Sequence, residues 1–225
     1  MPKPKRRRAE PLTEAVELRI VGGRFRGRKL RHEPFRMGDD ELVTRPMKHR
    51  LRETIFNLVS TAAEGRHAID LFAGTGALGL EALSRGAAQA TFIEKHVPTA
   101  RVIEENIAAL NVAEQSTLLT TSAFLWGKRD LKDPKRAGSS PTPATSLPWL
   151  VFCSPPYDFF VDREADMLEL VTSVVSAAPG GSIVVVECDE RFDLTLLPPG
   201  GAGEVWDVRP YPPAIIALLW KAADA

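Results

Sequence analysis

The chain of 225 residues is poor in cysteine and has no long apolar run. Its two cysteines, Cys153 and Cys188, lie in apolar stretches typical of strands, so buried reduced thiols are expected instead of a disulfide. No apolar segment follows the basic N-terminus, and nowhere do the roughly 18 consecutive apolar residues of a membrane helix occur. The four histidines are scattered, and no metal-ligand spacing is present. These absences predict a cytoplasmic protein with no metal and no membrane segment.

Charge is balanced overall but unevenly distributed. The formal net charge is zero, yet residues 1–52 hold 16 Lys or Arg against 7 Asp or Glu, and the remainder holds 13 against 22. A basic head on an acidic body favours a polyanionic partner at one end, although a solvated basic tail has the same composition. With 44% hydrophobic residues, the chain can bury the core of one catalytic domain with a small appendage.

Three regions are predicted from composition. Residues 1–14 are basic and proline-rich and should form a disordered tail. Residues 15–45 should hold a small β-hairpin, in which segments 16–21 and 28–31 flank the turn sequence Gly-Gly-Arg-Phe-Arg-Gly. Residues 46–225 form the main domain, interrupted by a flexible insertion at 127–148 that is rich in Pro, Ser, Thr and charge.

The main domain alternates apolar runs with segments of helical periodicity. Helices are expected over 46–63, up to Gly86, over 98–110 and over 163–178. Seven strands are expected at 68–72, 90–94, 116–121, 149–153, 182–188, 204–208 and 214–220. This order predicts a doubly wound, mostly parallel α/β sheet that ends in an antiparallel pair. Ligands of such sheets bind beyond the carboxyl ends of the strands.

A glycine-rich loop follows the first of these strands. After Asp70, glycines stand at 74, 76 and 79, and Glu94 ends the next strand, where a carboxylate would accept ribose hydroxyls. This pattern also matches the dinucleotide fingerprint, so a nicotinamide-dependent oxidoreductase is an alternative. Asp70 favours S-adenosylmethionine, because a carboxylate at this strand end suits the cofactor's cationic amino-acid end better than a pyrophosphate. A helix-capping carboxylate is the structural alternative.

A second motif, Ser154-Pro155-Pro156-Tyr157, follows the strand at 149–153 and resembles the [Asp/Asn/Ser]-Pro-Pro-[Tyr/Phe] loop of amino-group methyltransferases. The exocyclic amine of a base is a poor nucleophile, because its lone pair is delocalised into the ring. Accepting hydrogen bonds from its N–H groups would direct the lone pair at the methyl group, and residue 154 with the Pro155 carbonyl could do so. The prolines fix the loop, and Tyr157 could stack on a flipped-out base.

The chain as a whole resembles the bacterial ribosomal RNA small subunit methyltransferase D family, which methylates the guanine N2 amino group of 16S ribosomal RNA. The resemblance covers about residues 17–190 and is carried by Arg19-Ile-Val-Gly-Gly, Gly27-Arg-Lys-Leu, Arg45-Pro46, Arg52-Glu-Thr-Ile-Phe-Asn57 and the run 70–85. It implies a Rossmann-like class I methyltransferase fold and an S-adenosylmethionine site. The residues implied at that site are Asp70, Phe72, Gly74, Gly76, Glu94, Ser122 and Ala123.

The family resemblance also implies a monomer acting on 16S ribosomal RNA, either free or in an assembling small subunit. Three positions depart from the family pattern: Ser154 stands for the usual Asp, Ser122 for Asp or Asn, and His49 for Asp. A serine hydroxyl forms a weaker, uncharged hydrogen bond, so the departures predict slower chemistry or a different base.

The predicted RNA contacts are basic and aromatic. Phe25 is interleaved with hairpin residues suited to phosphates, and the start of the following helix adds two arginines, which makes the set Arg24, Arg26, Arg28, Lys29, Arg50 and Arg52. Guanine-N2 methylation is the leading hypothesis. The alternatives are an RNA-binding protein with weak or no activity, which Ser154 and Ser122 make credible, and an adenine-N6 methyltransferase.

Overall fold

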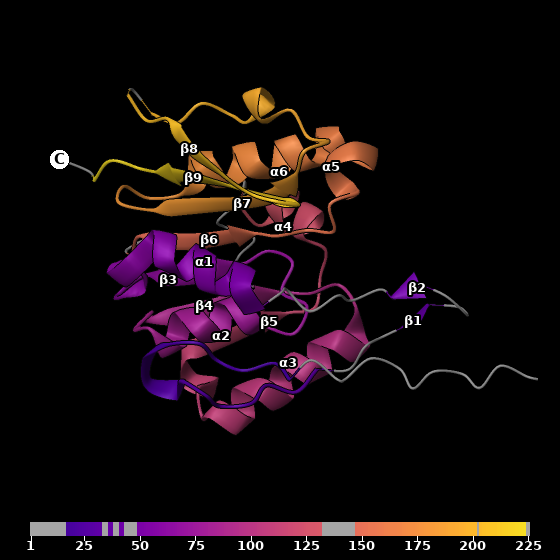
Figure 1. Ribbon diagram of the computed structural model, residues 1–225, viewed down its shortest axis with the longest axis vertical. Helices are drawn as coiled ribbons and strands as arrows, with labels where there is room; N and C mark the ends of the chain where they lie inside the picture. The colour runs from indigo at the N-terminus through magenta and orange to yellow at the C-terminus, as the bar shows by residue number, and fades with distance from the viewer. Residues whose placement is uncertain are drawn as a thin grey trace, which may run out of the picture.

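The computed structural model describes residues 17–32, 36–37, 41–42, 49–131, 147–201 and 203–223. A seven-stranded mixed sheet, in the order β5-β4-β3-β6-β7-β9-β8, runs through the middle of the molecule with helices on both faces (Figure 1). Its strands are β3 (His67–Asp70), β4 (Gln89–Ile93), β5 (Ser116–Leu119), β6 (Trp149–Cys153), β7 (Ile183–Asp189), β8 (Trp206–Tyr211) and β9 (Ala214–Trp220). A separate antiparallel pair joins β1 (Arg36–Met37) to β2 (Glu41–Leu42).

Strands β5, β4, β3, β6 and β7 are parallel, whereas β9 is antiparallel to both β7 and β8. The prediction of a mostly parallel sheet that ends in an antiparallel pair is therefore confirmed. The strand expected at 204–208 lies later, at Trp206–Tyr211, on the edge of the sheet. An edge position tolerates Pro210, because a residue without an N–H can sit where one side of the strand is unpaired.

Helices fill the connections between strands. They are α1 (His49–Val59), α2 (Ala77–Ser84), α3 (Val97–Leu110), α4 (Ala123–Arg129), α5 (Phe159–Asp162) and α6 (Glu164–Ala177), with short 3₁₀ turns η1 (Gly23–Phe25), η2 (Ser60–Ala63), η3 (Ala113–Gln115) and η5 (Leu194–Leu196). Local sequence sets the ends of α3. His96 accepts a hydrogen bond from the Thr99 N–H, Pro98 lies in the first turn, and Asn111 ends the helix in a left-handed conformation.

Each face of the sheet carries its own hydrophobic core. One core joins α1, α2, α3 and the N-terminal segment to residues such as Phe152, Val185 and Ile216. The other joins α4 and α6 to residues such as Val151 and Val186. Alternate residues of β6 and β7 thus serve opposite cores, as the period of two in a strand requires when both faces are covered.

The N-terminal segment 17–32 forms a hairpin that is less regular than predicted. Arg19 and Lys29 make a single antiparallel bridge. Hydrogen bonds run from the Ile20 N–H to the Arg28 carbonyl and from the Leu30 N–H to the Leu18 carbonyl, with η1 as the turn. Leu18, Ile20 and Leu30 are buried, so the hairpin packs on the domain and does not project from it.

Two sequence-based boundaries change. The flexible insertion was predicted from residue 127, but α4 continues to Arg129, and both Trp126 and Gly127 are buried against the domain. The prediction was wrong there because Gly127, Lys128 and Arg129 at the end of this helix have the composition of a loop. Residues 132–146 lie outside the described part of the chain. The helix expected over 46–63 is described from His49 and tightens into η2 after Val59. The tail at 1–14 also lies outside the described residues.

Candidate active site

The predicted cofactor loop and the Ser-Pro-Pro-Tyr loop leave two neighbouring central strands at their carboxyl ends. The chain runs from β3 to β4 and β5 on one side and returns to β6 on the other, so the β3–β6 junction is the topological switch point. Asp70 is paired with Phe152 across β3 and β6, and Ser154 follows two residues later. The structure therefore brings the glycine loop and the Ser-Pro-Pro-Tyr loop together, although 84 positions separate Asp70 from Ser154.

Glycines shape the loop between β3 and α2. Gly76 begins α2 with φ of 77°, in the left-handed region that costs other residues steric strain. Gly79 lies one turn into α2, where an added Cβ would stand 2.4 Å from Cε1 of Phe92, so α2 packs closely against β4. These two positions set the path of the loop between β3 and α2.

Asp70 is a buried carboxylate at these strand ends, with 1% of its surface exposed. Its Oδ2 accepts a hydrogen bond of 3.3 Å from the Gly79 N–H, so part of the helix-capping interpretation holds. Oδ1 has no hydrogen bond of normal geometry among the described residues, although the Phe72 N–H is near enough to affect its titration. Burial raises the pKa of Asp70 to about 7, against the smaller opposing effect of the Gly79 N–H. An orphaned buried oxygen fits the cationic end of S-adenosylmethionine, which would pair with it.

Glu94 follows β4 and holds the glycine loop. Its Oε2 accepts the Gly74 N–H at 2.9 Å, and its Oε1 accepts the His96 N–H at 2.8 Å. A carboxylate has about four acceptor positions, so it can keep both bonds and still accept ribose hydroxyls. Of the other predicted contacts, Ser122 begins α4 and is half-buried, and Ala123 behind it is buried.

Three phenylalanines meet at this edge, which the sequence prediction missed except for Phe72. The ring of Phe72 lies 5.8 Å from that of Phe124 and 6.1 Å from that of Phe159, and the latter two are 5.9 Å apart. The Arg163 guanidinium lies 3.9 Å from the centre of the Phe124 ring, and the Lys95 ammonium 5.5 Å from that of Phe159. The signal for the two that were missed was position, since Phe124 and Phe159 each follow shortly after a predicted strand.

The Ser-Pro-Pro-Tyr loop leaves β6 beside the end of β7. Tyr157 donates its hydroxyl hydrogen bond to Oε1 of Glu187 at 2.5 Å. Glu187 is 94% buried, and desolvation raises its pKa while the hydroxyls of Tyr157 and Ser154 lower it. The Ser154 hydroxyl is itself buried and has no hydrogen bond of good geometry among the described residues. Pro155 is buried and Pro156 exposed. Sequence analysis did not find Glu187, because a single Glu at the end of an apolar strand carries no motif.

The predicted RNA-contact residues separate into two groups. Arg24, Arg26, Arg28 and Lys29 are exposed on the hairpin, and Arg50 is exposed on α1. Arg24 donates to the Gln115 side chain and Arg28 to the Ala109 carbonyl, each through one terminal nitrogen, and a guanidinium has further donors for a phosphate. The Phe25 ring is half-buried against the core with the Arg24 guanidinium 4.5 Å from its centre, so it is not a free stacking surface.

Arg52 corrects the RNA-contact prediction. Its side chain is fully buried, donates from Nη2 to the Arg19 carbonyl, and lies with Nε 3.7 Å from Oε2 of Glu81. It therefore cannot reach a phosphate. The burial pattern of α1 explains the error, because positions 52, 55, 56 and 59 form the buried face and place Arg52 on the packed side of the helix. Desolvation lowers the pKa of Arg52, and the nearby Glu81 charge opposes this shift.

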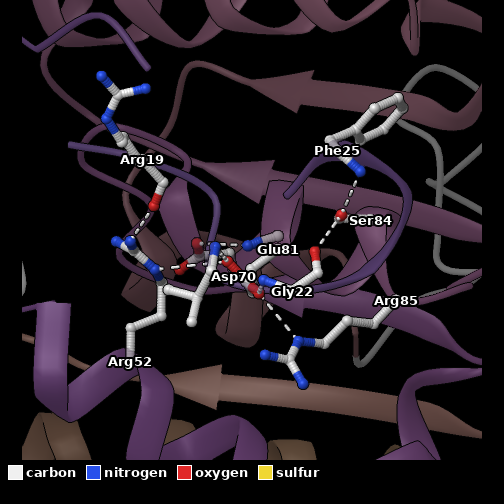
Figure 2. Close-up of polar contacts among 10 residues, drawn as sticks. Arg19, Gly22, Phe25, Arg52, Asp70, Glu81, Ser84 and Arg85 are labelled. Carbon is white, nitrogen blue, oxygen red and sulfur yellow. Dashed lines mark hydrogen bonds and ion pairs between the residues drawn. The ribbon is translucent and has the colours of Figure 1, made fainter. Parts of the chain in front are cut away.

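Glu81 of α2 joins the hairpin to the domain (Figure 2). Its carboxylate accepts the N–H groups of Val21 and Gly22 at 2.7 Å each and pairs with Arg85 at 2.9 Å. One turn further along α2, the Ser84 hydroxyl donates to the Gly22 carbonyl and accepts the N–H of Phe25. Sequence reasoning missed this junction, which fixes the basic hairpin to the helix that follows the glycine loop.

Within the described part of the chain, no helix is long and apolar enough to cross a membrane, and no group of three His, Cys, Asp or Glu side chains could hold a metal ion. Cys153 and Cys188 are buried free thiols, as predicted.

The strand order, the glycine loop and the buried carboxylate at its start define the fold of S-adenosylmethionine-dependent methyltransferases. A solved RNA methyltransferase of Salinibacter ruber, in complex with S-adenosyl-L-homocysteine, shares the fold with a TM-score of 0.53 at 14% identity over 80% of this chain and 95% of that one. The structure of Escherichia coli yhhF matches with a TM-score of 0.67 at 26% identity, over 92% of this chain and 99% of that one.

The sequence model of the family described as Conserved hypothetical protein 95 matches residues 18–200, and the chain belongs to this family. Two relatives carry the name Ribosomal RNA small subunit methyltransferase D. The Escherichia coli K12 protein is 45% identical over 94 residues, which is 42% of this chain and 44% of that protein, less than half the length of either. The Haemophilus influenzae protein is 32% identical over 150 residues, which is 66% of this chain and 68% of that protein. The resemblance inferred from the motifs is thus confirmed.

Proposed function

We propose that this protein transfers a methyl group from S-adenosylmethionine to the exocyclic N2 amino group of a guanine in 16S ribosomal RNA. One observation carries the proposal: the Ser-Pro-Pro-Tyr loop and the glycine loop with its orphaned Asp70 oxygen leave adjacent strands, β6 and β3. The relatives' names support ribosomal RNA as substrate class. The guanine N2 atom rests on the family resemblance of the motifs.

Each residue of the site has a part in this proposal. S-adenosylmethionine supplies an electrophilic methyl group when bound. Asp70 Oδ1 would pair with its ammonium, and Glu94 would accept the ribose hydroxyls while holding the Gly74 N–H. The Pro155 carbonyl and the Ser154 hydroxyl would accept hydrogen bonds from the target amine and turn its lone pair toward the methyl group. The nitrogen then gives up one proton to water.

The exposed hairpin arginines support binding of the RNA backbone. Arg24, Arg26 and Arg28 lie on a segment fixed to α2 through Glu81, so phosphates held there would stand in a defined place relative to the glycine loop. We propose that the protein acts as a monomer in the cytoplasm, where small ribosomal subunits are assembled. Ser154 and Ser122 keep two alternatives open: an RNA-binding protein with weak or no activity, and an adenine-N6 enzyme.

The decisive experiment maps methylated nucleotides in 16S ribosomal RNA by mass spectrometry, in cells with and without the gene. One N2-methylguanosine should vanish on deletion and return when the gene is restored. A lost N6-methyladenosine would instead select the adenine alternative. Full methylation in the deletion strain would leave the binding-only reading. In parallel, S-adenosylhomocysteine and not NAD should protect the purified protein from heat unfolding, which separates it from an oxidoreductase.

A further inference from the structure

Glu187 is the buried acidic group that the proposed reaction has not yet used. It lies near the carboxyl end of β7, next to the point where β6 ends and the Ser-Pro-Pro-Tyr loop begins. Cys153 pairs with Val186, so the next position on each strand places Ser154 beside Glu187. Neighbouring residues in parallel register point to the same face of a sheet, so the two side chains share one side.

Among the described residues, the side-chain hydroxyls near the Glu187 carboxylate come from the motif. Its Oε1 accepts the Tyr157 hydroxyl at 2.5 Å, and the Ser154 hydroxyl is close enough to lower its pKa. Its hydrogen-bond partner among the described residues is the neutral Tyr157 hydroxyl and not a cation, although Glu187 is only 6% exposed. A buried carboxylate without a cation is costly, so its presence at this place points to a task beyond packing.

The family's usual Asp at the first motif position would bring a charge to the target amine, and Ser154 does not. A hydroxyl that donates its hydrogen to a carboxylate keeps its oxygen lone pairs free and becomes a stronger acceptor, because hydrogen bonds in a chain polarise one another. The Ser154 hydroxyl is buried at the end of β6 and has no hydrogen bond of good geometry among the described residues, so it is available to turn its hydrogen toward Glu187.

We propose that Glu187 is a positioning residue for methyl transfer: it accepts a hydrogen bond from the Ser154 hydroxyl, polarises that oxygen toward the target amine, and holds Tyr157 against the base. The serine and glutamate together then supply the charge that a single aspartate supplies in relatives. This inference rests on the proposed amino-group methylation.

The test compares purified wild type with E187Q, S154D/E187Q and Y157F in methyl transfer from labelled S-adenosylmethionine to ribosomal RNA from cells that lack the gene. E187Q keeps the shape and an acceptor for Tyr157 but removes the charge. It should lower kcat about tenfold, which is the rate factor that corresponds to the difference in free energy between a charged and a neutral hydrogen bond. The KM for S-adenosylmethionine should not change. S154D/E187Q should regain most of the loss, because it returns a carboxylate to the first motif position. E190Q, an exposed change three residues away, is the matched control.

A second readout is independent of activity. The chain has only two tyrosines, so Y211F leaves Tyr157 as the single phenol that titrates. Burial and the Glu187 bond both raise the pKa of Tyr157, and phenolate absorbance should therefore appear at lower pH in Y211F/E187Q than in Y211F. An unchanged phenol titration overturns the contact itself.

The outcomes separate the inference from the function. Active wild type with E187Q equal to it overturns the role of Glu187 and leaves the methyltransferase proposal intact. If Y157F loses as much as E187Q and S154D/E187Q regains nothing, Glu187 acts only through Tyr157, and the Ser154 part is wrong. Wild type that binds S-adenosylhomocysteine but methylates no RNA defeats the proposed function, and the inference falls with it.

Discussion

Replacing Glu81 should release the hairpin and leave a buried charge in the core. Glu81 is fully buried and accepts two backbone N–H groups of the hairpin, at Val21 and Gly22, besides pairing with Arg85 and Arg52. In Glu81→Ala the two N–H groups and the buried Arg52 guanidinium lose their only carboxylate among the described residues.

The expected loss follows from these contacts. Each hydrogen bond to a charged group contributes about 1.5–3 kcal/mol, and breaking a buried ion pair on one side costs about 3–5 kcal/mol, because the remaining charge is uncompensated. These terms overlap, since they share one carboxylate. We therefore expect the free energy of unfolding to fall by about 3–5 kcal/mol and Tm by about 6–20 °C for a chain of this size.

Urea unfolding, followed by tryptophan fluorescence and circular dichroism, measures this loss. The matched control is Glu105→Ala, which removes an exposed ion pair of 2.8 Å with Arg31 and should cost less than about 1 kcal/mol. Arg52→Met/Glu81→Leu removes both buried charges and should recover part of the loss, because two apolar side chains leave neither charge unpaired. Arg52→Met alone should cost less than Glu81→Ala, because Glu81 keeps Arg85 and the backbone donors.

A Glu81→Ala variant whose stability matches that of Glu105→Ala would refute the reasoning. It would mean that water reaches Arg52 and the hairpin N–H groups, so that the ion pair and the two backbone bonds do not fix the hairpin. A double variant less stable than Glu81→Ala would likewise refute the account, because it would place the loss in packing and not in the unpaired charge.

Three further predictions concern the cofactor and RNA. The pKa of Asp70 is about 7 in the folded chain and near 4 in the unfolded chain, so the contribution of Asp70 to stability falls as pH rises from about 4 to 7. In Asp70→Asn, the free energy of unfolding measured with urea should therefore depend less on pH over this range. A pH dependence equal to that of wild type would contradict this. Glu94→Ala should weaken S-adenosylhomocysteine binding by about 1–3 kcal/mol in calorimetric titration with RNA affinity unchanged. Changing Arg24, Arg26 and Arg28 together to Ala should reduce the slope of log K for RNA binding against log salt concentration by roughly two. An unchanged slope would mean that these arginines contact solvent and not phosphates.

The sequence predicted the strands well because their burial is set by local composition. The run Trp149–Cys153 and residues 183–186 of β7 are apolar throughout, as strands covered on both faces must be. The glycine loop and Asp70 were found for a related reason: they lie within ten residues, so a short stretch of chain specifies the turn and the carboxylate beside it.

Errors arose where a residue's role depends on a distant partner. Arg52 was assigned to RNA, since a basic side chain near a helix start ordinarily faces solvent. Its burial depends on Glu81, which lies on another helix and brings the compensating charge. Phe25 was expected among the RNA contacts, but it packs on the core because the hairpin folds back onto α2.

The sequence by itself determined the fold class, the cofactor loop and the Ser-Pro-Pro-Tyr loop, because each is written in contiguous residues whose conformations are restricted locally. The tertiary structure decided which side chains complete them. Glu187 stands 33 positions after Ser154, and only the parallel pairing of β6 with β7 sets them side by side. Register between strands results from packing the whole sheet, so no local pattern in either strand could predict that Ser154 and Glu187 lie side by side.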